Sequence, residues 1–253
     1  MSADHEDRSG SEAAGQACDY PWDEYGQHAY YQQEDDGEDG EVSARLSHLT
    51  GKASLGLAIA SAEWLLRRFS RHPVPPLARQ YLDAAWAGAV HEAYVEYVEA
   101  SQFEWHGPVT GAIALAIDIL NTALHDMGND PDPSLQALWM YHLAHHVCPD
   151  PAPFDAWWEA CLQRLERFHA VDVELAGYKP DLFENFPRLG SPVPREAYDP
   201  GRPYDPASNV ALWDAFLRSL DPEDHPFLRS VADLEDFGEL GAPPYRYTGP
   251  QRR

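Results

Sequence analysis

The spacing of hydrophobic residues follows a helical period along most of the chain after residue 42. In the first run, apolar residues recur at alternating intervals of four and three positions, which places them on one face of a helix. This stripe comprises Leu55, Ile59, Ala62, Leu66 and Phe69. The helix is expected to end near His72, because the prolines that follow cannot continue it. A second stripe, whose helix is expected to end near Ser101, comprises Leu82, Trp86, Ala89, Ala93 and Tyr97.

Three more segments have the same period. The third predicted helix begins after Gly107-Pro108, and two neighbouring stripes on it are apolar, so it is expected to be central. A fourth helix is expected from about Ser134 to Val147, between a Gly/Asp/Pro turn and a group of prolines. A fifth is expected from about Phe154 to Glu174. Alternation typical of strands is nowhere sustained.

The chain changes character after the fifth helix. Residues 179–206 contain seven prolines, and we expect an irregular segment that crosses the surface of the bundle without adding to its core. Two shorter helices are expected around Val210–Leu220 and Phe227–Leu234. The sequence thus predicts an all-α protein, an antiparallel helical bundle of about five main helices plus two shorter C-terminal helices. Its predicted parts are a bundle core (43–176), a Pro-rich crossover (177–206), C-terminal helices of the same domain (207–240) and a loose tail (241–253).

Residues 1–42 are predicted to form a disordered acidic arm. They are rich in Gly, Ser, Gln, Asp and Glu and poor in aliphatic residues, so they bury too little surface to offset the entropy of ordering. One aromatic cluster interrupts this composition, at Tyr20-Pro-Trp-Asp-Glu-Tyr25 and Tyr30-Tyr31. The cluster is open to three interpretations: a short docking motif, a segment that folds back onto the body, or incidental aromatics in a solvated tail.

Net charge narrows the range of partners. The 42 acids and 18 bases give −24, and the segment from Gln80 to Gln163 holds no Lys or Arg. The electric field of this negative charge repels phosphate backbones and anionic lipids, so we expect no binding to nucleic acid or membrane. A basic protein is the complementary partner, although plain solubility also explains an acidic composition.

Location and redox state follow from what the sequence lacks. The N-terminus has no basic and apolar signal pattern, and the most apolar run, Ala112 to Leu120, is about half a bilayer span and contains Asp118. The three cysteines have neither disulfide nor metal spacing. A reducing, cytoplasmic location is therefore predicted, while the oligomeric state is left open.

Three histidines are the candidates for a metal site. His142 and His146 are four residues apart on one predicted helix, and His125 at the end of the preceding helix could supply a third ligand. No glutamate follows His142, so the pattern of zinc proteases is absent. Packing and a favourable position near the helix C-terminus explain the same histidines. Metal binding is therefore kept only as an alternative, and no cofactor is expected.

A polar stripe on the third helix is a candidate for acid–base chemistry. It comprises Asp118, Asn121, Thr122 and His125. Asp118 and His125 are two turns apart, so they could cooperate only through a bridging group. A solvated face or a satisfied internal network is the ordinary explanation.

The predicted second helix also carries an acidic face. Glu92, Glu96 and Glu99 recur at intervals of four and three, with Glu104 just beyond. Like charges at this spacing destabilise a helix slightly, which is easier to understand if the face meets Lys and Arg of a partner. Three interleaved aromatics could anchor such an interface: Tyr94, Tyr97 and Trp105.

No motif for nucleotide, acyl or thiol chemistry is present. The sequence therefore favours a non-catalytic acidic protein that sequesters or neutralises a cationic partner. Its most concrete form is an immunity (antitoxin-like) protein against a bacterial toxin. A metal-dependent enzyme using the histidine cluster and a secretion chaperone or adaptor are the alternatives.

Overall fold

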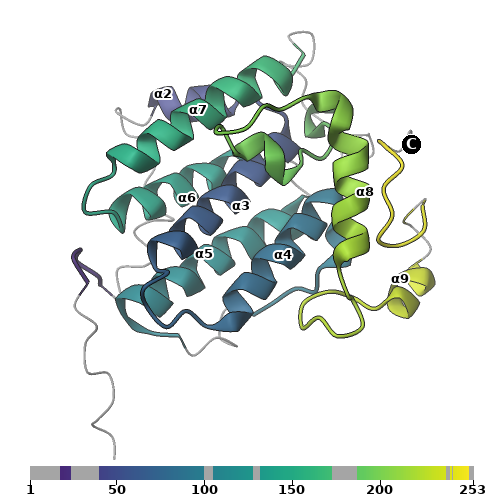
Figure 1. Ribbon diagram of the computed structural model, residues 1–253, viewed down its shortest axis with the longest axis horizontal. Coiled ribbons are helices and arrows are strands. Elements are labelled where there is room, and N and C mark those ends of the chain that lie inside the picture. The colour runs from purple at the N-terminus through teal and green to yellow at the C-terminus, as the bar shows by residue number, and fades with distance from the viewer. Residues whose placement is uncertain are drawn as a thin grey trace, which may run out of the picture.

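The predicted all-α antiparallel bundle is confirmed by a computed structural model (Figure 1), which describes residues 18–23, 40–99, 105–127, 132–172, 187–237, 240 and 242–250. Within these residues the chain forms eight α-helices and no β-strand. The helices are α2 (Gly40–Leu46), α3 (Gly51–Arg68), α4 (Pro76–Val90), α5 (Gly107–Asp126), α6 (Ser134–His146), α7 (Ala152–Phe168), α8 (Asn209–Ser219) and α9 (Val231–Phe237). Short 3₁₀ turns are η1 (Glu92–Tyr94), η3 (Pro187–Leu189), η4 (Arg195–Tyr198) and η5 (Pro206–Ser208).

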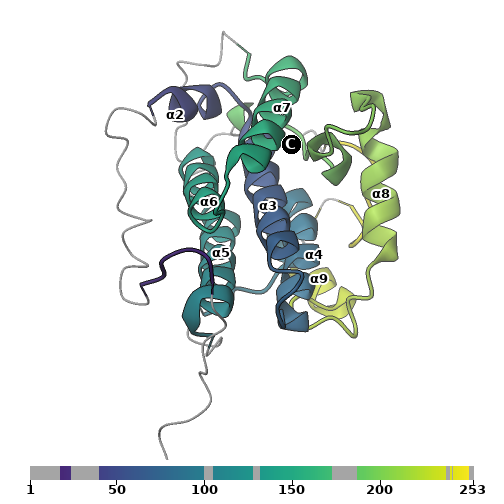
Figure 2. The same ribbon diagram turned by 60° about the vertical axis from the view of Figure 1, so that its left-hand side comes forward.

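Helix α3 is the central element of the bundle. It packs against α4, α5, α6 and α7, which surround it in both views (Figures 1 and 2). Every residue from Gly51 to Ala62 is buried, and most of them are Gly, Ala or Ser. Small side chains let neighbouring backbones approach closely, which explains how one helix can have packed neighbours on all sides.

Helix α5 has the length and composition of a membrane span, with a mean hydropathy of 1.4 over its most apolar window. In the bundle, 67% of that window is buried, and α5 packs against α3, α4 and α6. Its two apolar stripes are therefore accounted for by packing inside the protein.

The second predicted helix is shorter than expected. It ends at Val90, not near Ser101, because the next residues pair with a distant segment. Val95 forms an isolated antiparallel bridge with Leu228, and the Glu96 amide donates to the Phe227 carbonyl at 3.1 Å. The buried Asn121 side chain also holds the backbone of Val98, accepting from its amide at 3.1 Å and donating to its carbonyl at 2.9 Å. These nonlocal bonds replace the helical ones.

The Pro-rich crossover is irregular, but the expectation that it adds nothing to the core is wrong. Tyr198 of η4 is 4% exposed, and its hydroxyl donates to the Ala53 carbonyl of α3 at 2.9 Å. On the other side of η4, Arg164 of α7 donates to the carbonyls of Ala197 and Asp199 at 3.1 and 2.8 Å. The crossover is thus held by hydrogen bonds to both α3 and α7.

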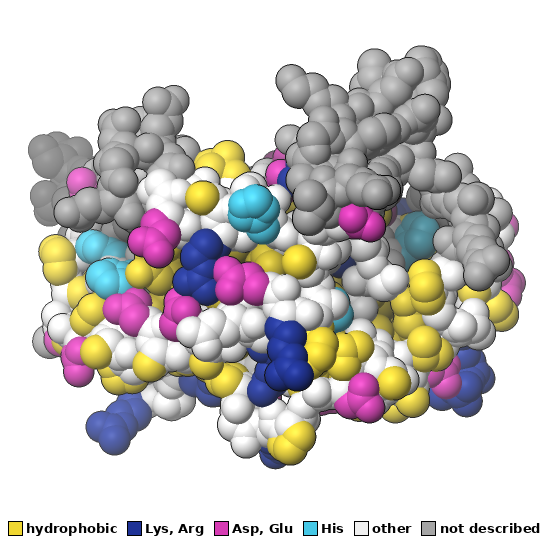
Figure 3. Space-filling view, turned by 90° about the horizontal axis from the view of Figure 1, so that it is seen from above, with side chains coloured by type: hydrophobic (Ala, Val, Ile, Leu, Met, Phe, Trp, Pro, Cys, Tyr) yellow, Lys and Arg dark blue, Asp and Glu magenta, His cyan; other side chains and the backbone are white. Residues whose placement is uncertain are grey.

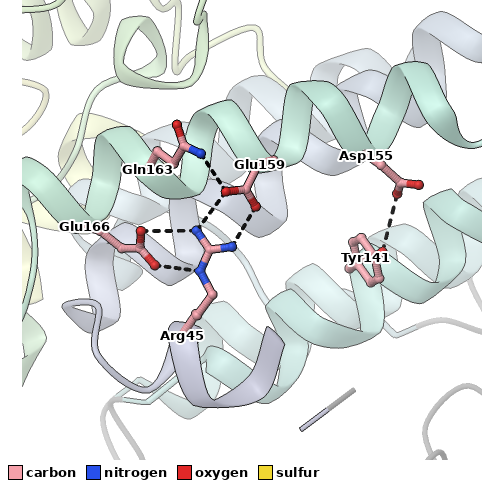
Figure 4. A network of polar contacts seen from close by, with 6 residues as sticks. All are labelled: Arg45, Tyr141, Asp155, Glu159, Gln163 and Glu166. Atoms are coloured by element: carbon pink, nitrogen blue, oxygen red, sulfur yellow. Dashed lines mark hydrogen bonds and ion pairs between the residues drawn. The ribbon is translucent and has the colours of Figure 1, made fainter. Parts of the chain in front are cut away.

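An ion-pair cluster joins α2 to α7 (Figure 4). The Arg45 guanidinium lies 2.6 Å from a Glu159 oxygen and 2.7 Å from a Glu166 oxygen. The hydrogen bond from Arg45 lowers the pKa of the Glu159 carboxyl. Arg45 can hold both carboxylates because the planar guanidinium presents several donors in fixed directions.

The aromatic cluster of the N-terminal arm is partly described. Residues 18–23 fold back onto the body, which selects one of the three interpretations for Tyr20-Pro21-Trp22. Tyr25, Tyr30 and Tyr31 lie outside the described residues, as does the rest of the predicted arm up to residue 39.

We expect Gly56→Ala to destabilise the protein by roughly 2–4 kcal/mol, measured by urea denaturation. A Cβ at Gly56 would overlap the Tyr198 phenol, so the ring would be pushed from its site and its hydrogen bond to Ala53 lost. In a Tyr198→Ala background the same change is expected to stabilise by up to about 1 kcal/mol, because alanine favours a helix. Destabilisation of equal size in both backgrounds would show that Tyr198 is not the cause.

Candidate functional site

The acidic residues predicted to share one helix face do not do so. Glu92 lies in η1, and Glu96 and Glu99 follow in an extended stretch, because α4 has already ended. Glu104 lies outside the described residues. The helical spacing argument for a single partner-binding face is therefore wrong, and each residue has to be placed separately.

Glu92 lies near a buried lysine. Lys52, in the first turn of α3, is 7% exposed, and burial lowers the pKa of its ammonium from 10.5 to about 8. The negative charge of Glu92 acts in the opposite direction and raises that pKa. The Glu92 carboxylate is half-buried and its charge acts on a cation inside the protein, whereas Glu96 and Glu99 are exposed.

The three predicted aromatic anchors also differ in accessibility. Tyr94 is 3% exposed and its ring stacks on Tyr245, with centroids 4.8 Å apart, so it belongs to the core. Trp105 is half-buried and packs against the core. Tyr97 is 56% exposed, and its ring makes an edge contact with the His125 imidazole at 5.2 Å. Of the three, Tyr97 alone presents a large part of its ring to solvent.

Glu96 lines an open hollow that the sequence did not reveal. Arg229, Asp233 and Asp236 line it with Glu96, and the two aspartates come from α9. The backbone pairing of residues 94–96 with 227–229 brings these segments together. Asp233 and Asp236 are three residues apart on a short helix, a pattern that by itself gives no reason to join them to Glu96.

His125 lies beside this hollow. Its pKa is lowered, chiefly by burial and further by the nearby Arg229 charge, against the opposing effect of a hydrogen bond to the Glu96 backbone. A neutral imidazole adds no positive charge to the hollow. Three carboxylates and one guanidinium therefore determine its charge.

The histidines proposed as metal ligands are not gathered into one site. His146 Nε2 lies 2.8 Å from the Pro21 carbonyl oxygen, the His142 ring contacts Tyr141, and the His125 ring contacts Tyr97. Among the described residues, no group of three or more His, Cys, Asp or Glu side chains could hold a metal ion. The described residues therefore provide no set of ligands for the alternative hypothesis of a metal-dependent enzyme.

The polar stripe on α5 contains an internal network. Asn121 is 2% exposed and binds both backbone groups of Val98, with the Tyr81 hydroxyl 3.5 Å from its oxygen. This amide fixes the stretch that carries Glu96 and Tyr97 against α5. Its role is therefore to position the surface next to the hollow.

Two acids of the base-free segment pair with arginines from elsewhere in the chain. Asp83 pairs with Arg195 at 3.0 Å, and Glu159 pairs with Arg45 at 2.6 Å. Figure 3 shows the face that is uppermost in Figure 1, where basic side chains lie among the acidic ones. Lack of Lys and Arg in a sequence window therefore overstates the acidity of the surface that the window forms.

No protein-family model, curated protein or solved structure matches this chain.

We expect Lys52 to destabilise the protein at neutral pH by an amount that shrinks as the pH rises from about 8 to 10. In this range the unfolded lysine, with a pKa of 10.5, keeps its proton while the folded one loses it, so the burial penalty disappears. Below pH 8 both states are protonated and the penalty is complete, so Lys52→Met should stabilise the protein at pH 7 by up to about 3 kcal/mol. Burial raises the pKa of the Cys148 and Cys161 thiols from 9.0 to about 11 and 12, so these groups lower the stability of both proteins above about pH 9, and the Lys52 effect is measured as the difference between the two proteins.

Urea denaturation of both proteins at several pH values from 7 to 10 measures this effect. The Lys52→Met protein is the control, because it retains every other titrating group. A difference in unfolding free energy between the two proteins that stays constant from pH 7 to 10 would contradict this account of Lys52.

Proposed function

We propose that this protein binds a cationic protein through the hollow lined by Glu96, Asp233 and Asp236, with Tyr97 beside it. The observation that carries the proposal is the excess of carboxylates over bases in an open concavity of the surface. Glu96 and Asp236 are exposed, and no ion pair with a described residue neutralises either. Lys or Arg side chains of a partner would supply the missing counter-charges.

The most concrete form of this function is inhibition. An immunity-type protein would cover the basic surface with which a toxin holds an anionic substrate, and its carboxylates would take the place of that substrate's charges. A secretion chaperone or adaptor would use the same complementarity but deliver its partner intact. A cytoplasmic, reducing location fits either role and agrees with three free thiols, Cys18, Cys148 and Cys161.

The hollow is suited to fast and selective encounter. Exposed carboxylates steer a basic partner over a distance set by screening, about 8 Å at physiological ionic strength. Arg229 interrupts the acidic lining, so a partner with an acid at that point would be favoured over one that is basic throughout. Tyr97 offers an exposed aromatic ring of the kind that contributes strongly to protein interfaces.

We expect the double replacement Glu96→Lys/Asp236→Lys to slow association with the natural partner by at least about ten-fold at low salt. The partner is obtained by affinity capture from the native host with elution at high salt, and association is then followed by stopped-flow fluorescence. These two acids were chosen because Asp233 also caps α9, donating from its amide to Ser230 Oγ and accepting from that hydroxyl.

The matched control is Glu41→Lys/Glu196→Lys. Both residues are exposed, and the change in net charge is the same. Rates within about two-fold of the original protein are expected, because these acids do not line the hollow. Equal slowing in the two variants would show that the partner responds only to overall charge, and the assignment of the hollow would fail.

A further inference from the structure

The arm segment 18–23 packs where the ends of three helices meet. Tyr20 is 9% exposed, and its hydroxyl donates to the carbonyl of Pro108 at the start of α5. Its ring lies against Phe69 and His146, with centroids 6.3 and 5.7 Å away. In Figures 1 and 2 the segment is the short purple trace next to the start of α5.

The residues on both sides of Tyr20 also contact the helical body. An Asp19 oxygen lies 2.5 Å from Arg68 at the end of α3, and the Pro21 carbonyl oxygen lies 2.8 Å from His146 Nε2 at the end of α6. Trp22 covers Gly111, where an added Cβ would lie only 3.1 Å from the indole. Glycine at this position leaves the space that the indole needs.

We define the arm groove by the residues that receive this segment, which are Arg68, Phe69, Pro108, Gly111 and His146. Each group of the segment has its own partner in the groove. Asp19 meets the Arg68 guanidinium, the Tyr20 hydroxyl meets the Pro108 carbonyl, and the Pro21 carbonyl meets the His146 imidazole. Trp22 lies over Gly111, which has no side chain. None of these contacts requires the ligand to be part of the same chain. The set has the character of peptide recognition, in which a buried aromatic anchor is oriented by polar contacts.

Because residues 24–39 link the segment to the body, the chain's own arm is favoured over other ligands of the groove. Sixteen residues separate Asp23 from Gly40, and for tethers of about this length local concentrations are on the order of millimolar. At micromolar protein, the arm of a second copy is therefore at a disadvantage of about a thousand-fold. An outside ligand of the same chemistry must overcome the same disadvantage.

We propose that the arm groove is a peptide-binding site for acid-Tyr-Pro-Trp segments and that residues 19–22 are its tethered occupant, which a partner protein carrying such a segment displaces. The site is separate from the acidic hollow. Gly111 and His125 lie near opposite ends of α5, about 20 Å apart along the helix. The two proposals can therefore fail independently.

The test uses the full-length chain with Tyr20→Ala/Trp22→Ala, which empties the groove. The probe is a fluorescent synthetic peptide of residues 17–24 with serine in place of Cys18, and its binding is followed by anisotropy. We expect it to bind the emptied variant at least about ten-fold more tightly than the original protein, whose own arm competes. Arg68→Glu added to the emptied variant should weaken this binding, and Tyr25→Ala/Tyr30→Ala, a matched pair of arm replacements, should leave the original weak binding unchanged.

Two outcomes would overturn the proposal. One is an emptied variant with full helical circular dichroism that fails to bind millimolar peptide. The other is a concentration-dependent dimer of the original protein that the emptied variant does not form, since the groove would then hold the arm of a second copy.

If the emptied variant does not fold, Arg68→Glu alone keeps the test decisive. Loss of the Asp19 ion pair is expected to speed amide hydrogen exchange of Asp19, Tyr20 and Trp22 by about ten-fold while exchange in the core of α3 is unchanged. Unchanged exchange in the segment would contradict an exchangeable occupant.

Discussion

The contact between Tyr198 and Gly56 is the constraint on which the rest of this structure depends. The phenol reaches α3 only because position 56 has no side chain, and its buried hydroxyl donates to the Ala53 carbonyl. From the other side, Trp86 packs on the Tyr198 ring at 5.5 Å and on Trp213 at 6.3 Å, which links α4 and α8 to the same point. One buried aromatic thus joins the bundle to an irregular segment that has few backbone bonds of its own.

The helical bundle could be predicted from the sequence because each helix is indicated by the spacing of apolar residues and prolines within its own segment. A period of 3.6 residues, interrupted by prolines, located α3, α5, α6 and α8 to within a few residues, whereas α7 ends at Phe168 and not near Glu174 as expected. The end of α4 could not be predicted in this way. Ala93 and Tyr97 continue the predicted helical stripe, but the backbone beside them bonds to distant residues. The Tyr94 carbonyl and the Glu96 amide bond to Arg229 and Phe227, and Val98 bonds to Asn121. Nonlocal pairing outweighed a weak local preference.

The candidate site was only partly visible for the same reason. Glu96 and Tyr97 were identified from the acidic and aromatic spacing, whereas Asp233 and Asp236 join them only after residues 94–96 pair with 227–229. Glu92 was counted as surface charge although Lys52 lies near it in the interior. Composition predicts the sign of the protein's net charge, but only the fold shows which charged side chains lie near an opposite charge of the same chain.

The two proposed surfaces differ in the physical force they use, and this difference allows them to act in one protein without interference. Carboxylates in the hollow act through a field that salt screens, so they control the rate of encounter with a basic protein. The arm groove acts mainly through the buried ring of Tyr20 and the half-buried ring of Trp22, which salt affects little, with one ion pair from Arg68. Because α5 carries one surface near each end, a ligand at one surface need not contact the other. α5 offers one route for coupling between them, through its middle, which is buried against α3 and α4.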